Sequence, residues 1–145
     1  MTAIHFDVMD SREPARQSLR ELAQFRYELR RFLRFSERAA RQAGVTPQQH
    51  QLMLGVAGFT SRGWANISEL AEFLQARHNA VVGLVERARR KGLVRKGRVE
   101  GDLRFIRVEL SPKGKKLLAQ LSALHRKELA RFQIRIGLGY GRIPP

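Results

Sequence analysis

The sequence predicts a mainly α-helical fold that carries one small β-hairpin. Apolar residues recur every three or four positions in two long stretches, which is typical of amphipathic helices. Helix-capping patterns open shorter helices between these stretches. Residues 93–110 instead alternate apolar and polar side chains on the two sides of a turn, as hairpin strands do. At 145 residues the chain has the length of one domain with its own core.

A first long amphipathic helix is expected over about residues 12–43. Pro14 opens it, because proline is tolerated in a first helical turn, and Gly44 is a suitable C-terminal cap. Its apolar stripe consists of Leu19, Leu22, Phe25, Leu29, Phe32, Ser36, Ala39 and Ala43. Its arginines are Arg12, Arg16, Arg20, Arg26, Arg30, Arg31, Arg34, Arg38 and Arg41. These form a solvated charged face, or a few of them contact phosphate or an anionic ligand.

Two shorter helices follow, each opened by a capping box. Thr46 precedes Pro47 and Gln49, and this helix is expected to run to about Ala57. Asn66 precedes Glu69 in the same way and opens a helix from Ile67 to about Leu74. A brief strand is expected around Trp64 between the two.

A fourth helix is predicted to begin near residue 78 and to end before Gly92. Val81, Leu84, Val85 and Ala88 form its apolar stripe. The other faces carry His78, Asn79, Val82, Gly83, Glu86, Arg87, Arg89 and Arg90. With the preceding helix it makes a candidate helix-turn-helix, whose second helix is basic on its outer face; an ordinary helical pair in a core is the alternative.

The hairpin directly after this helix supports the first interpretation, because a hairpin in that position is a wing. Leu93 and Val94 start one strand, residues 98–101 make the turn, and the return strand carries Ile106, Val108 and Leu110 on one face. A last long helix begins at Pro112 and runs to about residue 136. Its apolar stripe is Leu117, Leu118, Leu121, Leu124, Leu129, Phe132 and Ile136. Residues 137–145 contain too much glycine and proline for a helix and form a flexible tail.

The net charge of the chain indicates which class of molecule it binds. The formal net charge is +15, with 28 Lys and Arg against 13 Asp and Glu, and such a surface attracts polyanions. Nucleic acid is the expected partner; a membrane surface or an acidic protein is the alternative. The chain has no cysteine, which excludes disulfides and thiolate metal sites. No apolar run reaches the roughly 18 residues of a membrane span, and the acidic N-terminus does not look like a signal peptide, so we expect a cytoplasmic protein without a membrane segment.

Several motifs along residues 45–118 resemble the MarR family of winged helix-turn-helix transcriptional regulators. They are VTPQQ, ISELAEFL, VERARRKGLVRK, DLR and ELSPKG, in that order. The resemblance implies one domain with a winged-helix core at about residues 45–110 and long N- and C-terminal dimerisation helices at about 12–43 and 112–136. It also implies a homodimer on palindromic double-stranded DNA, more often a repressor than an activator.

The fourth helix is then the recognition helix. His78 and Asn79 suit hydrogen bonds to base edges near the helix start, and Val82 suits contact with a thymine methyl group. Asn79 is equally suited to cap the helix. Gly83 costs about 1 kcal/mol in a helix interior, which indicates close approach either to DNA or, more commonly, to another helix. Arg87, Arg89 and Arg90 lie further along and are expected to bind phosphates.

The wing is expected to reach the adjacent minor groove. By the resemblance, Arg104 in the Asp102-Leu103-Arg104 motif is the inserted arginine. Asp102 would orient a wing arginine through a charge-assisted hydrogen bond; its alternative role is to favour the turn. Arg95, Lys96 and Arg98 supply charge to phosphates.

The resemblance further implies a small anionic or aromatic effector in a crevice beside the dimerisation helices. Phe25, Leu29, His50, Met53 and Trp64 are the candidate lining, and each is also a plausible core residue. An effector acts only if it binds the DNA-competent and DNA-incompetent states unequally.

The two alternative classes of function are an enzyme and a nucleic-acid binder without sequence preference. The histidines, His5, His50, His78 and His125, are scattered without metal-ligand spacing, and GLGYG at 137–141 follows a helix instead of opening a βαβ unit. We therefore expect no enzyme, metal or cofactor. A binder of nucleic acid without sequence preference, or an architectural protein, explains the charge equally well but leaves the capped helix pair and its wing unexplained.

Overall fold

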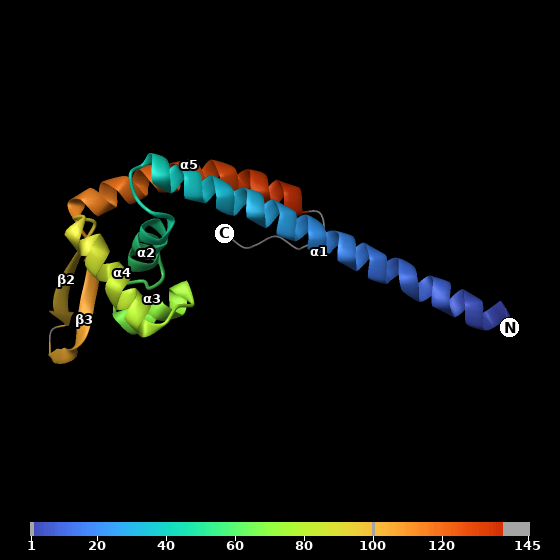
Figure 1. Cartoon of the computed structure of the whole chain (residues 1–145), viewed down its shortest axis with the longest axis horizontal. Helices are drawn as coiled ribbons and strands as arrows, with labels where there is room; N and C mark the ends of the chain where they lie inside the picture. Colours follow the sequence, from blue (N-terminus) through green and yellow to red (C-terminus); the bar gives the residue numbers. More distant parts are fainter. Residues whose placement is uncertain (1, 100, 138–145) are drawn as a thin grey trace. The chain divides into compact units, whose positions relative to one another are not determined.

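The computed structural model describes the backbone of residues 2–99 and 101–137 and the side chains of residues 12–98 and 106–137. Within these ranges the chain forms five helices and three strands (Figure 1). In chain order they are α1 (Thr2–Gln42), α2 (Pro47–Gly58), β1 (Trp64–Ala65), α3 (Ile67–Leu74), α4 (His78–Arg90), β2 (Val94–Val99), β3 (Asp102–Leu110) and α5 (Pro112–Ile136). The predicted mainly helical fold with a hairpin wing is confirmed.

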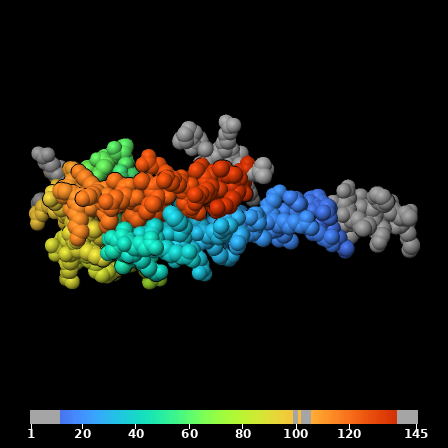
Figure 2. Space-filling model, turned by 90° about the horizontal axis from the view of Figure 1, so that it is seen from above, coloured from blue at the N-terminus to red at the C-terminus, as the bar shows by residue number. Residues whose placement is uncertain are grey.

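Contacts divide the chain into two compact units. The first contains residues 1–35 and 126–145, and the second contains residues 36–125. In the first unit, the C-terminal turns of α5 lie beside α1 (Figure 2). The ring of Phe132 packs against those of Phe25 and Phe32, with centroids 6.3 and 5.5 Å apart. This aromatic contact comes from the apolar stripes that the sequence placed on the two long helices.

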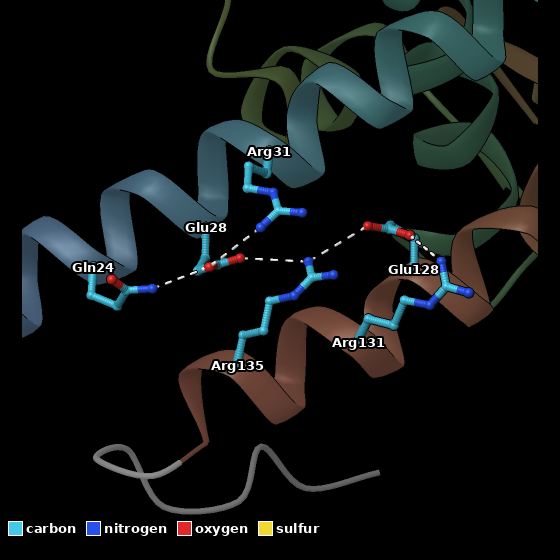
Figure 3. A network of polar contacts seen from close by, with 6 residues as sticks. All are labelled: Gln24, Glu28, Arg31, Glu128, Arg131 and Arg135. Carbon is cyan, nitrogen blue, oxygen red and sulfur yellow. Dashed lines mark hydrogen bonds and ion pairs between the residues drawn. The ribbon is translucent and has the colours of Figure 1, made fainter.

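A buried carboxylate accompanies these rings in the first unit (Figure 3). Glu28 is only 4% exposed and accepts a hydrogen bond of 3.1 Å from the side-chain amide of Gln24. Arg135 of α5 reaches Glu28 at 3.5 Å and Glu128 at 3.7 Å. Arg31 lies 3.9 Å from the same carboxylate. Because a buried charge is stable only when it is paired, Arg135 and Arg31 together compensate the charge of Glu28.

The predicted start of the first helix at Pro14 is wrong, because α1 begins at Thr2 and contains Pro14 in its interior. Proline lacks an N–H and crowds the carbonyl four residues earlier, so it commonly kinks a helix without ending it. The helix ends at Gln42, close to the predicted end, and Gly44 takes a left-handed φ of 85°.

The second unit has a core built from the expected apolar stripes. Its largest fully buried side chains come from α2, α3, α4, the sheet, α5 and the residue before β2. They are Leu52, Met53, Val56, Leu70, Val81, Val85, Leu93, Val94, Val108 and Leu121. Val81, Val85 and Ala88 follow each other at helical spacing on one face of α4. Because that face is buried, the opposite face of α4 is left to solvent.

The predicted helix starts at α2 and α3 are confirmed. The backbone N–H of Gln49 donates to the Thr46 hydroxyl at 3.1 Å, and the Thr46 N–H donates to the Gln49 side chain at 3.0 Å. Asn66 and Glu69 make the same reciprocal pair at α3. Each box satisfies two N–H groups that a helix terminus would otherwise leave unpaired.

The sheet has the order β1-β3-β2, and both pairs are antiparallel. The expected strand at Trp64 therefore adds a third strand to the hairpin. The ladder shifts register between Arg98 and Val99, and β2 continues to Val99, so the turn is shorter than the predicted residues 98–101. Val108 and Leu110 are buried, whereas Ile106 on the same face is 42% exposed because it lies closer to the hairpin tip.

The junction of α4, the hairpin and α5 is tied by Ser111. Its hydroxyl accepts a hydrogen bond of 3.0 Å from the Gly114 N–H and donates to the Gly92 carbonyl. Lys113 donates to the Lys91 carbonyl at 3.0 Å, just after the end of α4. These bonds fix where the hairpin leaves the end of α4.

Candidate nucleic-acid interface

The exposed face of α4 carries the residues predicted to read bases. His78, Asn79 and Ala80 form its first turn and are exposed, and Val82 is 43% exposed one residue after the buried Val81. A helix with small and polar side chains at an open N-terminal end matches what a DNA major groove accepts.

The alternative role of Asn79 as the helix cap is excluded. The N-cap residue is Arg77, which makes no side-chain hydrogen bond to the helix, and Asn79 lies in the first turn. Arg77 and His78 are also exposed. The N–H groups of this turn therefore have no side-chain cap among the described residues, in contrast to α2 and α3.

Among the described residues, no other helix packs closely against Gly83. A Cβ atom built on it would meet only the flexible guanidinium of Arg87, at 3.1 Å, within the same helix. Gly55 of α2 shows the contrasting case, because a Cβ there would lie 2.5 Å from the ring of Phe73. Of the two explanations offered for Gly83, close approach to a second helix is thus not seen in the described residues.

Glu86 is a central residue of this surface that the sequence interpretation did not single out. It receives Arg89 in bidentate fashion, with the Nε and Nη2 atoms 3.0 and 2.6 Å from its two oxygens. Lys96 of β2 lies 2.8 Å away and Arg90 lies 3.5 Å away. Three of the predicted phosphate-binding cations therefore share one carboxylate.

These hydrogen bonds, first from Arg89 and then from Lys96, lower the pKa of Glu86 to about 2. The group therefore remains ionised at any pH in which DNA binding is measured. Its spacing to Arg89 and Arg90, three and four residues, was visible in the sequence as a helical ion-pair pattern. The contact with Lys96 was not, since it depends on how the hairpin packs on α4.

The cations of the wing that were predicted to bind phosphate, and whose side chains are described, lie on β2. Arg95 and Arg98 are exposed, while Lys96 is 33% exposed beside Glu86. The side chains of Asp102 and Arg104, predicted to act together in the wing, lie outside the described residues. Their backbones belong to β3, with Asp102 opposite Val99.

A hollow of about 530 Å³ opens between the end of α4 and β2. It is lined by Arg89, Gly92, Val94, Arg95, Lys96 and Ser111. Two partners of Glu86, Arg89 and Lys96, thus border the same space.

The residues predicted to line an effector crevice are divided between the units. Phe25 and Leu29 lie half-buried in the first unit, where Phe25 contacts Phe132. His50, Met53 and Trp64 lie in the second unit, where Met53 is fully buried in the core. The effector lining stays a prediction.

Two guanidinium groups lie close to the ring of Trp64. Those of Arg62 and Arg107 lie 3.9 and 5.0 Å from its ring centroid, and Arg62 is also paired with Glu69. Cations over an indole face are attracted by its quadrupole. No sequence pattern predicted this cluster, because its members come from a loop, α3 and two strands.

His50 is buried next to His125, with ring centroids 4.8 Å apart. The Nδ1 atom of His125 lies 2.7 Å from the Leu121 carbonyl and donates to it, and its Nε2 lies 2.8 Å from the Ser36 hydroxyl, from which it accepts when the ring is neutral and to which it donates when the ring is protonated. Nδ1 of His50 has no hydrogen-bond partner among the described residues. Burial, and then the charge of His125, lower the pKa of His50 from 6.5 to about 4.

Among the described residues, no group of three or more His, Cys, Asp or Glu side chains lies close enough together to hold a metal ion. No helix of the same residues combines the length and the apolar character that a membrane crossing requires.

Solved structures with the same fold are known. The MarR family transcription regulator SP03579 aligns with a TM-score of 0.71 and 23% identity, over 84% of this chain and 79% of its own. The transcriptional regulator PA4135 aligns with a TM-score of 0.64 and 28% identity, over 80% and 81%. A mutant of S. aureus MepR bound to an oligodeoxyribonucleotide aligns with a TM-score of 0.62 and 19% identity, over 76% and 78%. No protein-family model and no curated protein matches the sequence.

Proposed function

The chain has the winged-helix fold of the MarR family regulators, and from this premise we propose that it is a transcription regulator that binds double-stranded DNA in a sequence-specific manner. The observation that carries the proposal is the surface of the second unit. The N-terminal turn of α4, its basic last turn and the basic strand β2 all carry exposed side chains outside the apolar core, and Lys96 of β2 contacts Glu86 of α4. A helix for the major groove and a ribbon beside it is the arrangement by which winged-helix proteins bind a duplex.

Within this proposal the side chains divide by task. His78, Asn79 and Val82 contact base edges, and Gly83 lets the helix backbone approach the duplex. Arg87, Arg89, Arg90, Arg95, Lys96 and Arg98 bind phosphates, which fixes register without reading sequence. Arg104 enters the minor groove with Asp102 as its partner.

We further propose that the protein acts as a homodimer on a palindromic operator. One helix and one wing bury too little surface for tight specific binding, whereas a dimer contacts two half-sites about one helical turn apart. The first unit carries exposed apolar side chains on both long helices, including Leu19, Leu22, Leu33 and Ile134. A second copy would remove these side chains from water.

Selection of bound duplexes from a random pool tests this function. We expect a palindrome whose half-site spacing equals one helical turn, and competition should show that it binds about a thousandfold more tightly than random DNA. Equal competition by random DNA would instead support the rival function, a nucleic-acid binder or architectural protein that relies on charge alone.

Repression and release by a small anionic or aromatic effector complete the proposal. Trp64 is the single tryptophan of the chain, so its fluorescence offers a direct readout of effector binding to the free protein. An effector that lowers operator affinity must itself bind less tightly to the DNA complex, by the same factor. Equal effector affinity for the two forms would contradict release.

A further inference from the structure

A carboxylate at the centre of a phosphate-binding surface needs an explanation. Glu86 lies among the cations of α4 and β2, where it would repel an approaching DNA backbone. It also occupies hydrogen-bond donors of Arg89 and Lys96 that phosphates would otherwise receive. A residue with these two unfavourable effects on binding is expected to have a compensating role.

The geometry identifies that role as a link between two elements. Arg89 follows Glu86 by one helical turn, but Lys96 belongs to the wing strand β2. Glu86 is therefore the point at which α4 and the wing are joined through charged side chains. Arg89 is held bidentately at 3.0 and 2.6 Å, which fixes the plane of its guanidinium as well as its position.

The two cations held by Glu86 also border the hollow between α4 and β2. Arg89 is 46% and Lys96 33% exposed, so neither is closed off by its contact with the carboxylate. The hollow, at about 530 Å³, is large enough for a phosphate group. Long side chains lose conformational freedom when they bind, and prior immobilisation by Glu86 reduces that cost.

We propose that Glu86 is a positioning residue of the DNA interface, and that it holds Arg89 and Lys96 so that both bind one backbone phosphate at the hollow. The inference rests on the proposed DNA-binding function and adds a residue and a shared phosphate to it. A carboxylate that only reduced the charge of the surface would leave the two cations to bind separate phosphates.

A comparison of two charge-neutralising substitutions tests the positioning role. Glu86→Gln and Glu72→Gln each remove one negative charge, and Glu72 is exposed on α3 without an ion pair among the described residues. Both variants should bind random DNA several-fold more tightly. Only Glu86→Gln should lose preference for the selected duplex, by about tenfold, because its cations are no longer held in place. The same preference in both variants would overturn the positioning role.

The shared phosphate is tested by salt dependence. The slope of log affinity against log salt is about −0.9 per phosphate neutralised. If Arg89 and Lys96 share a phosphate, Arg89→Gln and Lys96→Gln should each leave the slope almost unchanged, and the double variant should make it shallower by about 0.9 per subunit. Arg98 is a cation without an ion pair among the described residues. Adding Arg98→Gln to any of these variants should therefore make the slope shallower by about a further 0.9 per subunit.

A loss of about 1.8 per subunit in the double variant, with half of it in each single variant, would overturn the shared phosphate. Melting curves by circular dichroism establish that each variant is folded. A wild-type protein without any preferred duplex would overturn the proposed function, and the salt slopes on random DNA would still decide between one phosphate and two.

Discussion

His50 shows how a single buried side chain couples folding to pH. The unfolded chain protonates this residue near pH 6.5, whereas the folded protein does so only near pH 4. The folded state therefore binds fewer protons in this window, and the free energy of unfolding is highest above pH 6.5 and falls as the pH is lowered toward 4. At about 1.4 kcal/mol per pH unit over this interval, the loss reaches at most about 3.5 kcal/mol.

We predict that His50→Gln reduces this pH dependence. Urea unfolding followed by circular dichroism at about pH 7 and pH 4.5 should show a smaller difference in the variant than in the wild-type protein. Removing a group that charges only in the unfolded chain removes the cause of the difference. An identical difference in the two proteins would show that other groups produce it.

Gly114 illustrates a residue fixed by close backbone approach. A Cβ at this position would lie 2.1 Å from the carbonyl oxygen of Leu93, which cannot move without disturbing the strand. We predict that Gly114→Ala lowers the free energy of unfolding by about 1 to 3 kcal/mol through overpacking. Gly58→Ala is the control, because nothing lies within 4 Å of its added Cβ and alanine favours the helix. Chemical denaturation of both variants gives the comparison, and an unaffected Gly114→Ala would contradict it.

At the scale of elements, α4 differs from α2 and α3 because its N-terminus has no side-chain cap among the described residues. α2 and α3 begin with complete capping boxes, whereas Arg77 caps α4 without a side-chain hydrogen bond. Capping side chains contribute about 1 kcal/mol each. With no side-chain cap among the described residues, the first backbone N–H groups of α4 can donate to a DNA phosphate while the side chains of the same turn contact base edges.

Gly83 allows a test of how closely α4 approaches DNA. Gly83→Ala should raise the free energy of unfolding by about 0.5 to 1 kcal/mol, because alanine is the better helix former. The same methyl group should weaken operator binding about tenfold by holding the helix away from the groove. Denaturation and fluorescence anisotropy measure the two effects, and Gly58→Ala should show only the first. Unchanged operator affinity in Gly83→Ala would place its backbone away from the duplex.

At the scale of the whole molecule, charge sets the strength of binding to any duplex. If each of two subunits neutralises about four phosphates, the slope of log affinity against log salt should be near −7. Filter binding or anisotropy from about 50 to 200 mM salt measures it. A slope shallower than about −3 would mean that the proposed surface contacts far fewer phosphates.

The exposed apolar side chains of the first unit predict the oligomeric state. Leu22 and Leu33 of α1 are 52% and 45% exposed, and burying a leucine contributes about 1.5 to 3 kcal/mol. We expect sedimentation velocity to show a dimer, and the double substitution Leu22→Arg with Leu33→Arg to shift it to a monomer. Leu54→Arg changes an equally exposed leucine on α2 and should leave the dimer intact. A dimer that survives the double substitution would place the interface elsewhere.

The sequence by itself determined the elements of this protein. Capping boxes at Thr46 and Asn66 and the spacing of Val81, Val85 and Ala88 specify helix starts and buried faces, because these interactions join residues within one or two helical turns. The hairpin after α4 followed from strand alternation in the same way. The predicted helix start at Pro14 was wrong, because α1 begins at Thr2. Proline removes one backbone hydrogen bond, and the turns on either side of it determine whether the helix continues.

Only the tertiary structure decided which charges meet. Lys96 of the wing contacts Glu86 of α4, Arg107 of β3 lies over the ring of Trp64, and His50 lies beside His125, which is 75 residues away in the chain. The exclusion of a helix contact at Gly83 likewise required coordinates. Such contacts depend on the packing of elements against each other, and the free energy that selects a packing comes from apolar burial, which does not specify the polar neighbours that it brings together.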